Sequence, residues 1–347
     1  MAAAVSTATW VEWITSVMGG VSRQSYAATF PPDRFYCLLN ELPLQLVQQN
    51  FRRNLRAESF EEELRLNPEC RISPAENIPE EFLGRRDLLA GFAMQGAIAW
   101  VRDSARQALL PFWLGPELES AVSAVRRGES VRSAISPGAV RVLKAAGILV
   151  SDEDRRKTED QRKEAIQQSG ESFRRNGYAP IGDLIHPFHV AALRRYYRYM
   201  IRSGNIYLGD AQSSRRYVAH NEPVARFFHH QLMSTLSQIA GEPLKPSYVY
   251  LASYLSGAEL KKHIDREQCE FSITLCVDFS PEPEMATPWP IQLDTSNGSV
   301  TVNQMIGDAL TYRGTQLPHY RDRLPEGQSS TSIFFHYVGA DFSGPLD

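Results

Sequence analysis

Three side chains in the last third of the sequence could together bind one metal ion. His263 and Asp265 are two residues apart, and His319 follows in a separate segment. Residues i and i+2 of a strand point to the same side, so His263 and Asp265 can reach one ion from one strand. Two imidazoles and one carboxylate leave coordination positions open, and this ligand set is typical of non-haem iron(II) centres that use dioxygen. The pattern therefore predicts an iron-dependent oxidation site.

The segments around these residues support the predicted metal site. An HxD pair alone is a weak signal, because a surface histidine beside an aspartate also produces it. Here a tyrosine-rich strand, residues 247–255, precedes the pair, and an alternating strand, residues 271–279, follows it. Residues 307–310 form a predicted turn into the strand that leads to the second histidine. We therefore expect neighbouring strands to bring the three ligands together.

The composition is that of an ordinary globular protein. The 347 residues are 43% hydrophobic, which is ample for a core. A net charge of -3 argues against a nucleic-acid partner and against an anionic membrane surface. No segment approaches the ~20 consecutive apolar residues that a membrane span needs. The four cysteines are scattered without a CxxC pair, which indicates neither a zinc site nor a disulfide framework and favours a reducing, cytoplasmic location.

The elements of the N-terminal part, residues 1–150, are predicted to be helical. Leucines recur at helical spacing in residues 31–60, and residues 85–109 contain apolar positions that predict a further helix. Residues 116–150 are interrupted by glycine and proline, which predicts two or three short helices. This region is therefore expected to be a helical packing unit.

The chain changes character after residue 150. Residues 151–175 carry a dense run of mixed charge, which predicts a solvated helix connecting two domains. Residues 176–347 contain two predicted amphipathic helices, 184–202 and 223–240, and then short alternating strands such as 331–338. Short strands at this spacing are typical of a β-sandwich or jelly roll. The sequence thus predicts an α+β protein, in which a helical region and a charged helix precede a jelly roll with flanking helices.

Residues 176–340 resemble the iron(II)- and 2-oxoglutarate-dependent dioxygenases, in particular the prolyl-hydroxylase-like branch. The HxD pair, the distal histidine and the strands around them carry this resemblance. It implies a double-stranded β-helix fold in which His263, Asp265 and His319 bind iron(II). It also implies that 2-oxoglutarate and dioxygen are cosubstrates, and that a small-molecule or peptide substrate is oxidised. Hydroxylation of an amino acid, a peptide or a biosynthetic intermediate is the reaction that the resemblance favours.

The anchor for 2-oxoglutarate departs from the family pattern. The family places an arginine or lysine about ten residues after the distal histidine, whereas residues 327–332 contain no basic residue. Arg321 follows the distal histidine by two positions and is the first candidate to bind the far carboxylate, with Arg323 as the second. Tyr254 and Ser332 are predicted to add hydroxyl donors. The alternative for Arg321 is a surface salt bridge with a neighbouring acidic residue.

Two other functions remain open at this point. A jelly roll with a structural metal would be a non-catalytic, cupin-like metal-binding or regulatory protein, and the missing base on the last strand favours it. A DNA-associated regulator would use the winged-helix-like segment of residues 128–149, where a few arginines form a thin basic patch. The identity of the substrate and the oligomeric state do not follow from the sequence.

Overall fold

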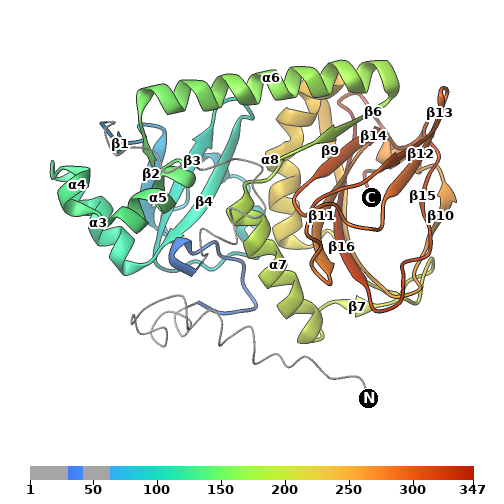
Figure 1. Cartoon of the computed structure of the whole chain (residues 1–347), viewed down its shortest axis with the longest axis horizontal. Coiled ribbons are helices and arrows are strands. Elements are labelled where there is room, and N and C mark those ends of the chain that lie inside the picture. Colours follow the sequence, from blue (N-terminus) through green and yellow to red (C-terminus); the bar gives the residue numbers. More distant parts are fainter. Residues whose placement is uncertain (1–29, 42–62) are drawn as a thin grey trace. The chain divides into compact units, whose positions relative to one another are not determined.

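The computed structural model describes residues 30–41 and 63–347. The chain divides into two units, residues 1–31 and residues 32–347, and the elements below belong to the second unit. Its C-terminal part contains two antiparallel sheets with helices beside them, and its N-terminal part contains a smaller sheet with short helices (Figure 1).

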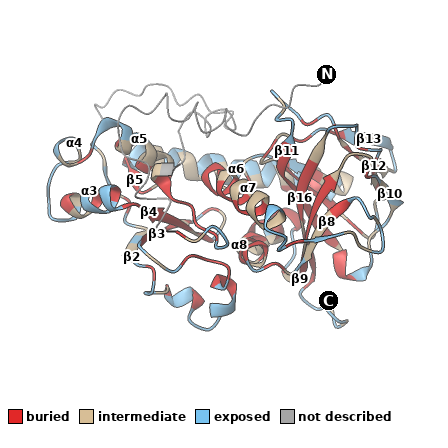
Figure 2. Cartoon of the chain, turned by 90° about the horizontal axis from the view of Figure 1, so that it is seen from below, coloured by how far each residue is buried: buried red, intermediate tan, exposed pale blue. Residues whose placement is uncertain are grey.

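The larger sheet of the C-terminal part has seven strands in the order β6, β14, β11, β16, β9, β8, β7. All neighbouring strands in it run antiparallel. The strands span Tyr178–Ile181 (β6), Tyr207–Leu208 (β7), Arg216–His220 (β8), Leu244–Leu255 (β9), Phe271–Ser280 (β11), Ala309–Arg313 (β14) and Ser329–Gly339 (β16). The central strand β11 is buried along almost its whole length (Figure 2), because both of its faces are covered.

The smaller sheet has four strands in the order β10, β15, β12, β13. These strands span Leu260–His263 (β10), Ile291–Thr295 (β12), Gly298–Val302 (β13) and His319–Arg321 (β15). Apolar side chains of β12 and β13 form a cluster with Leu310 and Tyr312 of β14 in the larger sheet. The two sheets therefore share a core and face each other.

The order of the strands identifies the architecture. From β9 to β16 the chain passes between the sheets: β9, β11, β14 and β16 lie in the larger sheet, and β10, β12, β13 and β15 lie in the smaller one. Eight strands that alternate in this way between two facing antiparallel sheets form a jelly roll of the double-stranded β-helix type. The predicted fold of this part of the chain is therefore confirmed by the topology.

Three helices lie beside the seven-stranded sheet, namely α6 (Asp152–Asn176), α7 (Pro187–Arg202) and α8 (Pro223–Ala240). Helix α6 is the predicted charged helix. It begins after Ser151, whose hydroxyl accepts a hydrogen bond from the backbone N–H of Asp154, and it ends at Gly177 in the left-handed conformation. Near its end, the ring of Phe173 packs 6.1 Å from the ring of Phe271 in β11. This helix is thus anchored to the jelly roll at its C-terminal end.

Residues 85–109 do not form a helix, which corrects the sequence prediction. An antiparallel sheet in the order β2, β3, β4 occupies much of this stretch, with strands Cys70–Pro74, Ala97–Asp103 and Ala108–Leu114. The turn between β3 and β4 contains Gln107, whose φ of 54° does not occur inside an α-helix. Both faces of β3 and β4 are largely buried, so their apolar residues form a continuous run without the alternation that indicates a strand.

The predicted helix over residues 31–60 is also wrong where the structure describes it. Up to residue 41, the helical residues are Leu39–Glu41, which form a short 3-10 helix. Phe35 and Leu38 instead form isolated β-bridges to the sheet region that follows. The remainder of this prediction, residues 42–60, lies outside the described residues.

The short helices predicted for residues 116–150 are confirmed. They are α3 (Pro116–Arg126), α4 (Val131–Ala134) and α5 (Pro137–Ala145). The side chains of Ser130 and Ser136 cap the last two helices by accepting backbone N–H bonds. A two-stranded pair, β1 (Arg65–Leu66) with β5 (Leu149–Val150), closes this part of the chain.

Two expectations from the sequence concerned disulfide bonds and membrane-spanning segments. All four cysteines, Cys37, Cys70, Cys269 and Cys276, are free. Among the helices in the described ranges, none has the length and apolar character to cross a membrane.

Candidate metal centre

Strands β10 and β15 place the two predicted histidine ligands opposite each other. His263 ends β10, His319 begins β15, and the register pairs these two residues directly. Their imidazole ring centres are 4.4 Å apart. Asp265 lies just beyond β10, and its Oδ1 is 3.6 Å from Nε2 of His263 and 3.5 Å from Nε2 of His319. The structure thus brings the three predicted ligands together at the edge of the smaller sheet.

Backbone carbonyls orient both imidazole rings. Nδ1 of His263 lies 2.7 Å from the carbonyl oxygen of Lys261, and Nδ1 of His319 lies 2.9 Å from that of Leu317. Because a carbonyl oxygen only accepts, each Nδ1 must carry the proton and donate it. Each Nε2 then carries a lone pair beside the carboxylate of Asp265, and Nε2 of His319 also lies 3.5 Å from the hydroxyl of Tyr312. This tautomer is the one that a histidine metal ligand needs.

The electrostatics of the site favour a bound cation. Burial raises the pKa of Asp265, but the two imidazoles beside it outweigh burial and hold its pKa far below the usual range. The carboxylate of Asp265 in turn raises the pKa of His263, because a nearby negative charge favours the protonated imidazole. The carboxylate is therefore ionised at neutral pH, and it needs positive charge nearby.

The donor set and its spacing fit a divalent transition metal. The three ligating atoms lie within 4.8 Å of one another. Donors that share one ion at ~2.1 Å are roughly 3 Å apart, so the present site needs only a small contraction. The side chain of His263 is 33% exposed, whereas that of His319 is 2% exposed, so the site opens to solvent on one side. Two imidazoles and one carboxylate with an open side suit iron(II).

Arg321 points into the space between the sheets, on the same side of β15 as His319. Both residues are buried, with Arg321 only 4% exposed. The guanidinium donates to the carbonyl oxygen of Trp289 and, over 2.8 Å, to Oε1 of Gln304. It also lies 4.9 Å from the ring centre of Trp289. No carboxylate of the described residues forms an ion pair with it, and burial lowers its pKa. The surface salt bridge considered as the alternative is therefore wrong.

The other predicted hydroxyl donors lie in the same interior. Tyr254 is 1% exposed, and its ring packs at 5.0 Å against Trp289. Its hydroxyl accepts a hydrogen bond of 3.3 Å from Arg216, a buried residue that the sequence analysis did not single out. The hydroxyls of Ser332 and Thr274, on the adjacent strands β16 and β11, have no hydrogen-bond partner among the described residues. Such atoms are rarely left unpaired in a protein interior, so they are available to a ligand.

Arg323, the second candidate for the anchor, lies elsewhere. It is exposed, two residues beyond the end of β15. A Cβ atom added at Gly257 would lie 3.2 Å from its guanidinium, which places Arg323 beside the turn between β9 and β10. The structure does not bring it into the interior with Arg321.

Ser272, beside the metal ligands, was missed by the sequence analysis, whereas His336 in the last strand was expected to pack in the core or to support the ligands without binding the metal. Ser272 of β11 is fully buried, and its hydroxyl lies 3.1 Å from Oδ2 of Asp265. On its other side, the same hydroxyl lies 2.9 Å from Nδ1 of His336 in β16. Burial lowers the pKa of His336 to about 4. The sequence did contain a signal for Ser272: it is a polar residue in the predicted strand 271–279, at a position that faces the interior.

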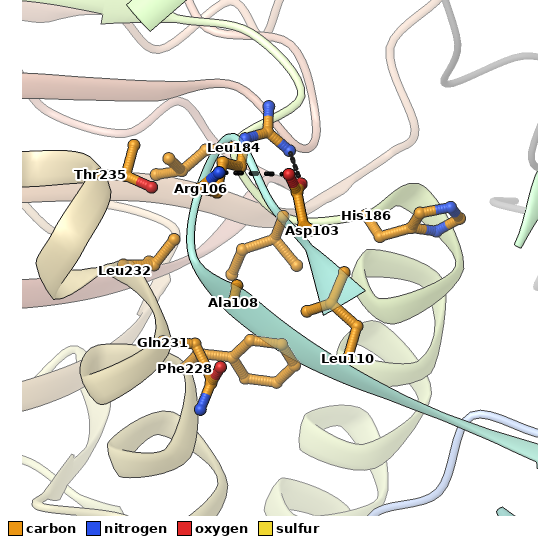
Figure 3. Close-up of a pocket in the computed structure, with 11 residues that line it drawn as sticks. Asp103, Arg106, Ala108, Leu110, Leu184, His186, Phe228, Gln231, Leu232 and Thr235 are labelled. Carbon is orange, nitrogen blue, oxygen red and sulfur yellow. Dashed lines mark hydrogen bonds and ion pairs between the residues drawn. The ribbon is translucent and has the colours of Figure 1, made fainter. Parts of the chain in front are cut away.

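A small cavity lies away from this centre. It is placed between the β3–β4 turn and helices α7 and α8, and its lining includes Asp103, Arg106, Phe228, Leu232 and Thr235 (Figure 3). Its volume of about 20 Å³ suffices for one water molecule and not for a substrate. It is therefore not a candidate catalytic site.

Comparisons with known proteins give likenesses in structure alone. No family model matches the chain, and no curated protein matches its sequence. A prolyl-4-hydroxylase of Pseudomonas putida is 15% identical with a TM-score of 0.42, over 50% of this chain and 98% of that one. AviO1 of Streptomyces viridochromogenes is 17% identical with a TM-score of 0.42, over 52% of this chain and 97% of that one.

A third similar structure contains ligands. The epimerase SnoN of nogalamycin biosynthesis, in complex with Fe3+, alpha-ketoglutarate and nogalamycin RO, is 12% identical with a TM-score of 0.43, over 51% of this chain and 84% of that one. At identities and scores this low, the chemistry of the present chain rests on its own residues. Other similar structures are described as a non-haem alpha-ketoglutarate-dependent epimerase, a non-haem alpha-ketoglutarate-dependent carbocyclase and a member of the 2OG-Fe(II) oxygenase family.

Proposed function

We propose that this chain is an iron(II)- and 2-oxoglutarate-dependent oxygenase. His263, Asp265 and His319 would hold the iron. Their donor atoms lie within 4.8 Å of one another, and protonation of both Nδ1 atoms leaves a lone pair on each Nε2. A facial set of two histidines and one carboxylate leaves positions for 2-oxoglutarate and dioxygen.

The buried, unpaired guanidinium of Arg321 is the observation that carries this proposal. Burying a charge without a counter-ion costs several kcal/mol. Arg321 is 4% exposed and has no carboxylate partner among the described residues. A dicarboxylate in the interior would supply the missing negative charge.

The placement of the iron ligand and the anchor suits 2-oxoglutarate. Arg321 follows His319 by two residues, and both side chains point to the buried side of β15. A dicarboxylate with one end on the metal could therefore direct its other end to the guanidinium. The unpaired hydroxyls of Ser332 and Thr274, with Tyr254 nearby, would add neutral hydrogen bonds to the same ligand.

The chain supplies placement, and its ligands supply the oxidation. Bound iron and 2-oxoglutarate would couple the reduction of dioxygen and the decarboxylation of 2-oxoglutarate to oxidation of an unactivated C–H bond. The iron held in part by His319 would bind one end of the cosubstrate, and Arg321 would bind the other end on the buried side of the site. His263 lies on the exposed side, where a substrate can approach. Hydroxylation of an amino acid, a peptide or a biosynthetic intermediate is the proposed outcome.

The same observation weighs against a purely structural metal. A cupin-like protein that only binds a metal would gain nothing from an unpaired arginine in its interior, and it would be destabilised by it. We therefore prefer the catalytic function to the regulatory one.

Anaerobic addition of iron(II) and 2-oxoglutarate to the purified protein tests the proposal. A weak visible charge-transfer band that needs both components, and that His319→Ala abolishes, is the expected result. Tight iron binding without any band on addition of 2-oxoglutarate would contradict the oxygenase and favour a metal-binding role.

A further inference from the structure

We propose that Ser272 and His336 are positioning residues that keep Asp265 bound to the metal through a single oxygen. This inference rests on the proposed metal site. It explains how a second oxygen of Asp265 is kept from occupying a coordination position that the cosubstrates need. Both residues are buried, and His336 does not belong to the group of ligand atoms formed by His263, Asp265 and His319.

The hydrogen bonds around Ser272 have only one consistent direction. Its Oγ lies 3.1 Å from Oδ2 of Asp265, 3.3 Å from the carbonyl oxygen of Cys269 and 2.9 Å from Nδ1 of His336. The two oxygens only accept, so the single hydroxyl proton goes to one of them, and the closer, charged carboxylate is the better acceptor. Nδ1 of His336 must then be the donor to Ser272. The chain runs from His336 through Ser272 to Asp265.

The backbone at Gly314 closes the other side of the carboxylate. The N–H of Asp265 donates to the carbonyl oxygen of Gly314 over 2.9 Å. A Cβ atom added at Gly314 would collide with Oδ2 of Asp265 and with the carbonyl oxygen of Cys269, and it would lie 2.9 Å from Oγ of Ser272. Only glycine leaves room for this arrangement. The hydroxyl of Ser272 and the backbone at Gly314 thus hold the carboxylate of Asp265 from two sides.

Confinement of Oδ2 decides how Asp265 can coordinate. Oδ1 faces the two Nε2 atoms, while Oδ2 is held by the hydroxyl of Ser272. A carboxylate that turned to bind through both oxygens would occupy a second coordination position. With 2-oxoglutarate and dioxygen to be bound beside three protein ligands, the ion would have no coordination position left for a second oxygen of Asp265. Loss of the Ser272 hydroxyl should therefore lower the affinity for 2-oxoglutarate more than the affinity for iron(II).

The same residues could instead form a second metal site. Ligand atoms of Asp265, Cys269 and His336 also lie within 4.8 Å of one another. However, the hydroxyl of Ser272 is already bonded to two of these residues, and Sγ of Cys269 lies 3.0 Å from the hydroxyl of Tyr248. Their polar atoms thus have partners within the protein. We assign the group to hydrogen bonding, and the experiment below distinguishes the two possibilities.

The experiment compares iron(II) and 2-oxoglutarate binding in matched variants under anaerobic conditions. Ser272→Ala should weaken 2-oxoglutarate binding at least ~10-fold, the lower end of the effect of losing an outer-shell partner. Iron(II) binding should weaken less, because Oδ1 of Asp265 could still bind the ion. His336→Phe keeps the ring and removes the donor, so it should act in the same direction. His336→Asn should restore binding, because its amide N–H can replace Nδ1–H.

Thr311→Val is the matched control. Thr311 is a buried residue of β14 whose hydroxyl also has no partner among the described residues. It lies on the opposite side of its strand from Tyr312, whose ring packs against His319, so it points away from the site. Its loss of a buried hydroxyl should leave both titrations unchanged.

Each outcome of this experiment has a distinct meaning. A wild-type protein that binds no iron(II) would overturn the proposed function and this inference with it. A wild-type charge-transfer band, together with unchanged 2-oxoglutarate titrations in Ser272→Ala and His336→Phe, would overturn only the positioning role. A second equivalent of metal that is lost in Cys269→Ala would also overturn it, because His336 would then be a ligand.

Discussion

At the scale of single residues, the site is prepared for a metal by groups that are not ligands. The carbonyls of Lys261 and Leu317 set the tautomers of both histidines. These carbonyls belong to residues two positions before each histidine, so each histidine and its orienting group come from the same short segment. Residue types and spacing were enough to predict the ligands. Their orientation depends on backbone geometry, which residue types do not reveal.

Asp265→Ala should remove iron(II) binding while the protein stays folded. The variant loses the only charged ligand of the three, so the affinity should fall by more than the ~10–100-fold expected for an outer-shell change. Calorimetric titration with iron(II) under anaerobic conditions measures this, and circular dichroism checks the fold. Retention of wild-type affinity would show that the ligand assignment is wrong.

Arg321→Met should have opposite effects on stability and on ligand binding. Without ligand, the variant removes an unpaired buried charge, so its free energy of unfolding should be equal to or higher than that of the wild type. Binding of 2-oxoglutarate should weaken by ~10–100-fold, because a charge-assisted hydrogen bond contributes ~1.5–3 kcal/mol. Thermal unfolding with and without iron(II) and 2-oxoglutarate measures both effects.

Arg323→Met serves as the matched control for that variant. Arg323 is exposed, so its loss should leave 2-oxoglutarate binding unchanged. A larger loss of affinity in Arg323→Met than in Arg321→Met would move the anchor to the surface residue.

At the scale of elements, the sequence predicted helices and strands correctly where one face of the element is apolar and the other is polar. Helix α8 has the predicted bounds, 223–240, and β16 extends the predicted strand 331–338 by a few residues. It failed for β3 and β4, since burial of both faces removes the alternation. The interior position of Arg321 followed from the spacing along its strand, but its lack of an acidic partner depends on tertiary packing.

Buried histidines on α7 should make the fold sensitive to acid. His189 is fully buried, its Nε2 lies 2.8 Å from the carbonyl oxygen of Pro111, and burial lowers its pKa to about 4. As the pH falls below 6.5, the unfolded chain takes up a proton that the folded chain does not. Stability is therefore present above pH 6.5 and is lost towards pH 4, by up to roughly 1.4 kcal/mol per pH unit.

His189→Gln tests this contribution. Glutamine keeps a donor for the carbonyl of Pro111 but does not titrate, so denaturant unfolding should show a shallower loss of stability between pH 6.5 and 4. His220→Gln is the control, because His220 is a partly exposed histidine. Equal pH dependence of wild type and His189→Gln would contradict the argument.

At the scale of the whole described unit, residues 32–347, a buried charge joins the N-terminal sheet to helix α6, which packs on the jelly roll. Asp103 of β3 is 3% exposed and lies 3.1 Å from Arg162 of α6. It also lies 3.6 Å from Arg106, which is drawn beside it in Figure 3. The predicted boundary at residues 151–175 remains a prediction. The ion pair nevertheless ties the N-terminal sheet to the helix at that boundary.

Asp103→Asn should destabilise the unit by about 1–3 kcal/mol, because it leaves charged partners without their counter-ion. Chemical denaturation followed by tryptophan fluorescence measures the change. Glu129→Gln is the control, since the Glu129–Arg127 pair is exposed and its loss should cost less than ~0.5 kcal/mol. A variant Asp103→Asn as stable as the control would show that the pair does not join the parts.

Helix α6 also sets a limit on how this chain can be divided. Its 25 residues span about 37 Å, with Arg162 paired to the N-terminal sheet and Phe173 packed on the jelly roll. A gene fragment starting at residue 176 would encode all eight jelly-roll strands, yet it would lack part of their hydrophobic cover. The smallest part of this protein that could be exchanged between genes as a folded unit therefore begins before the first jelly-roll strand. It begins inside residues 151–175, the segment whose charged composition is typical of a linker.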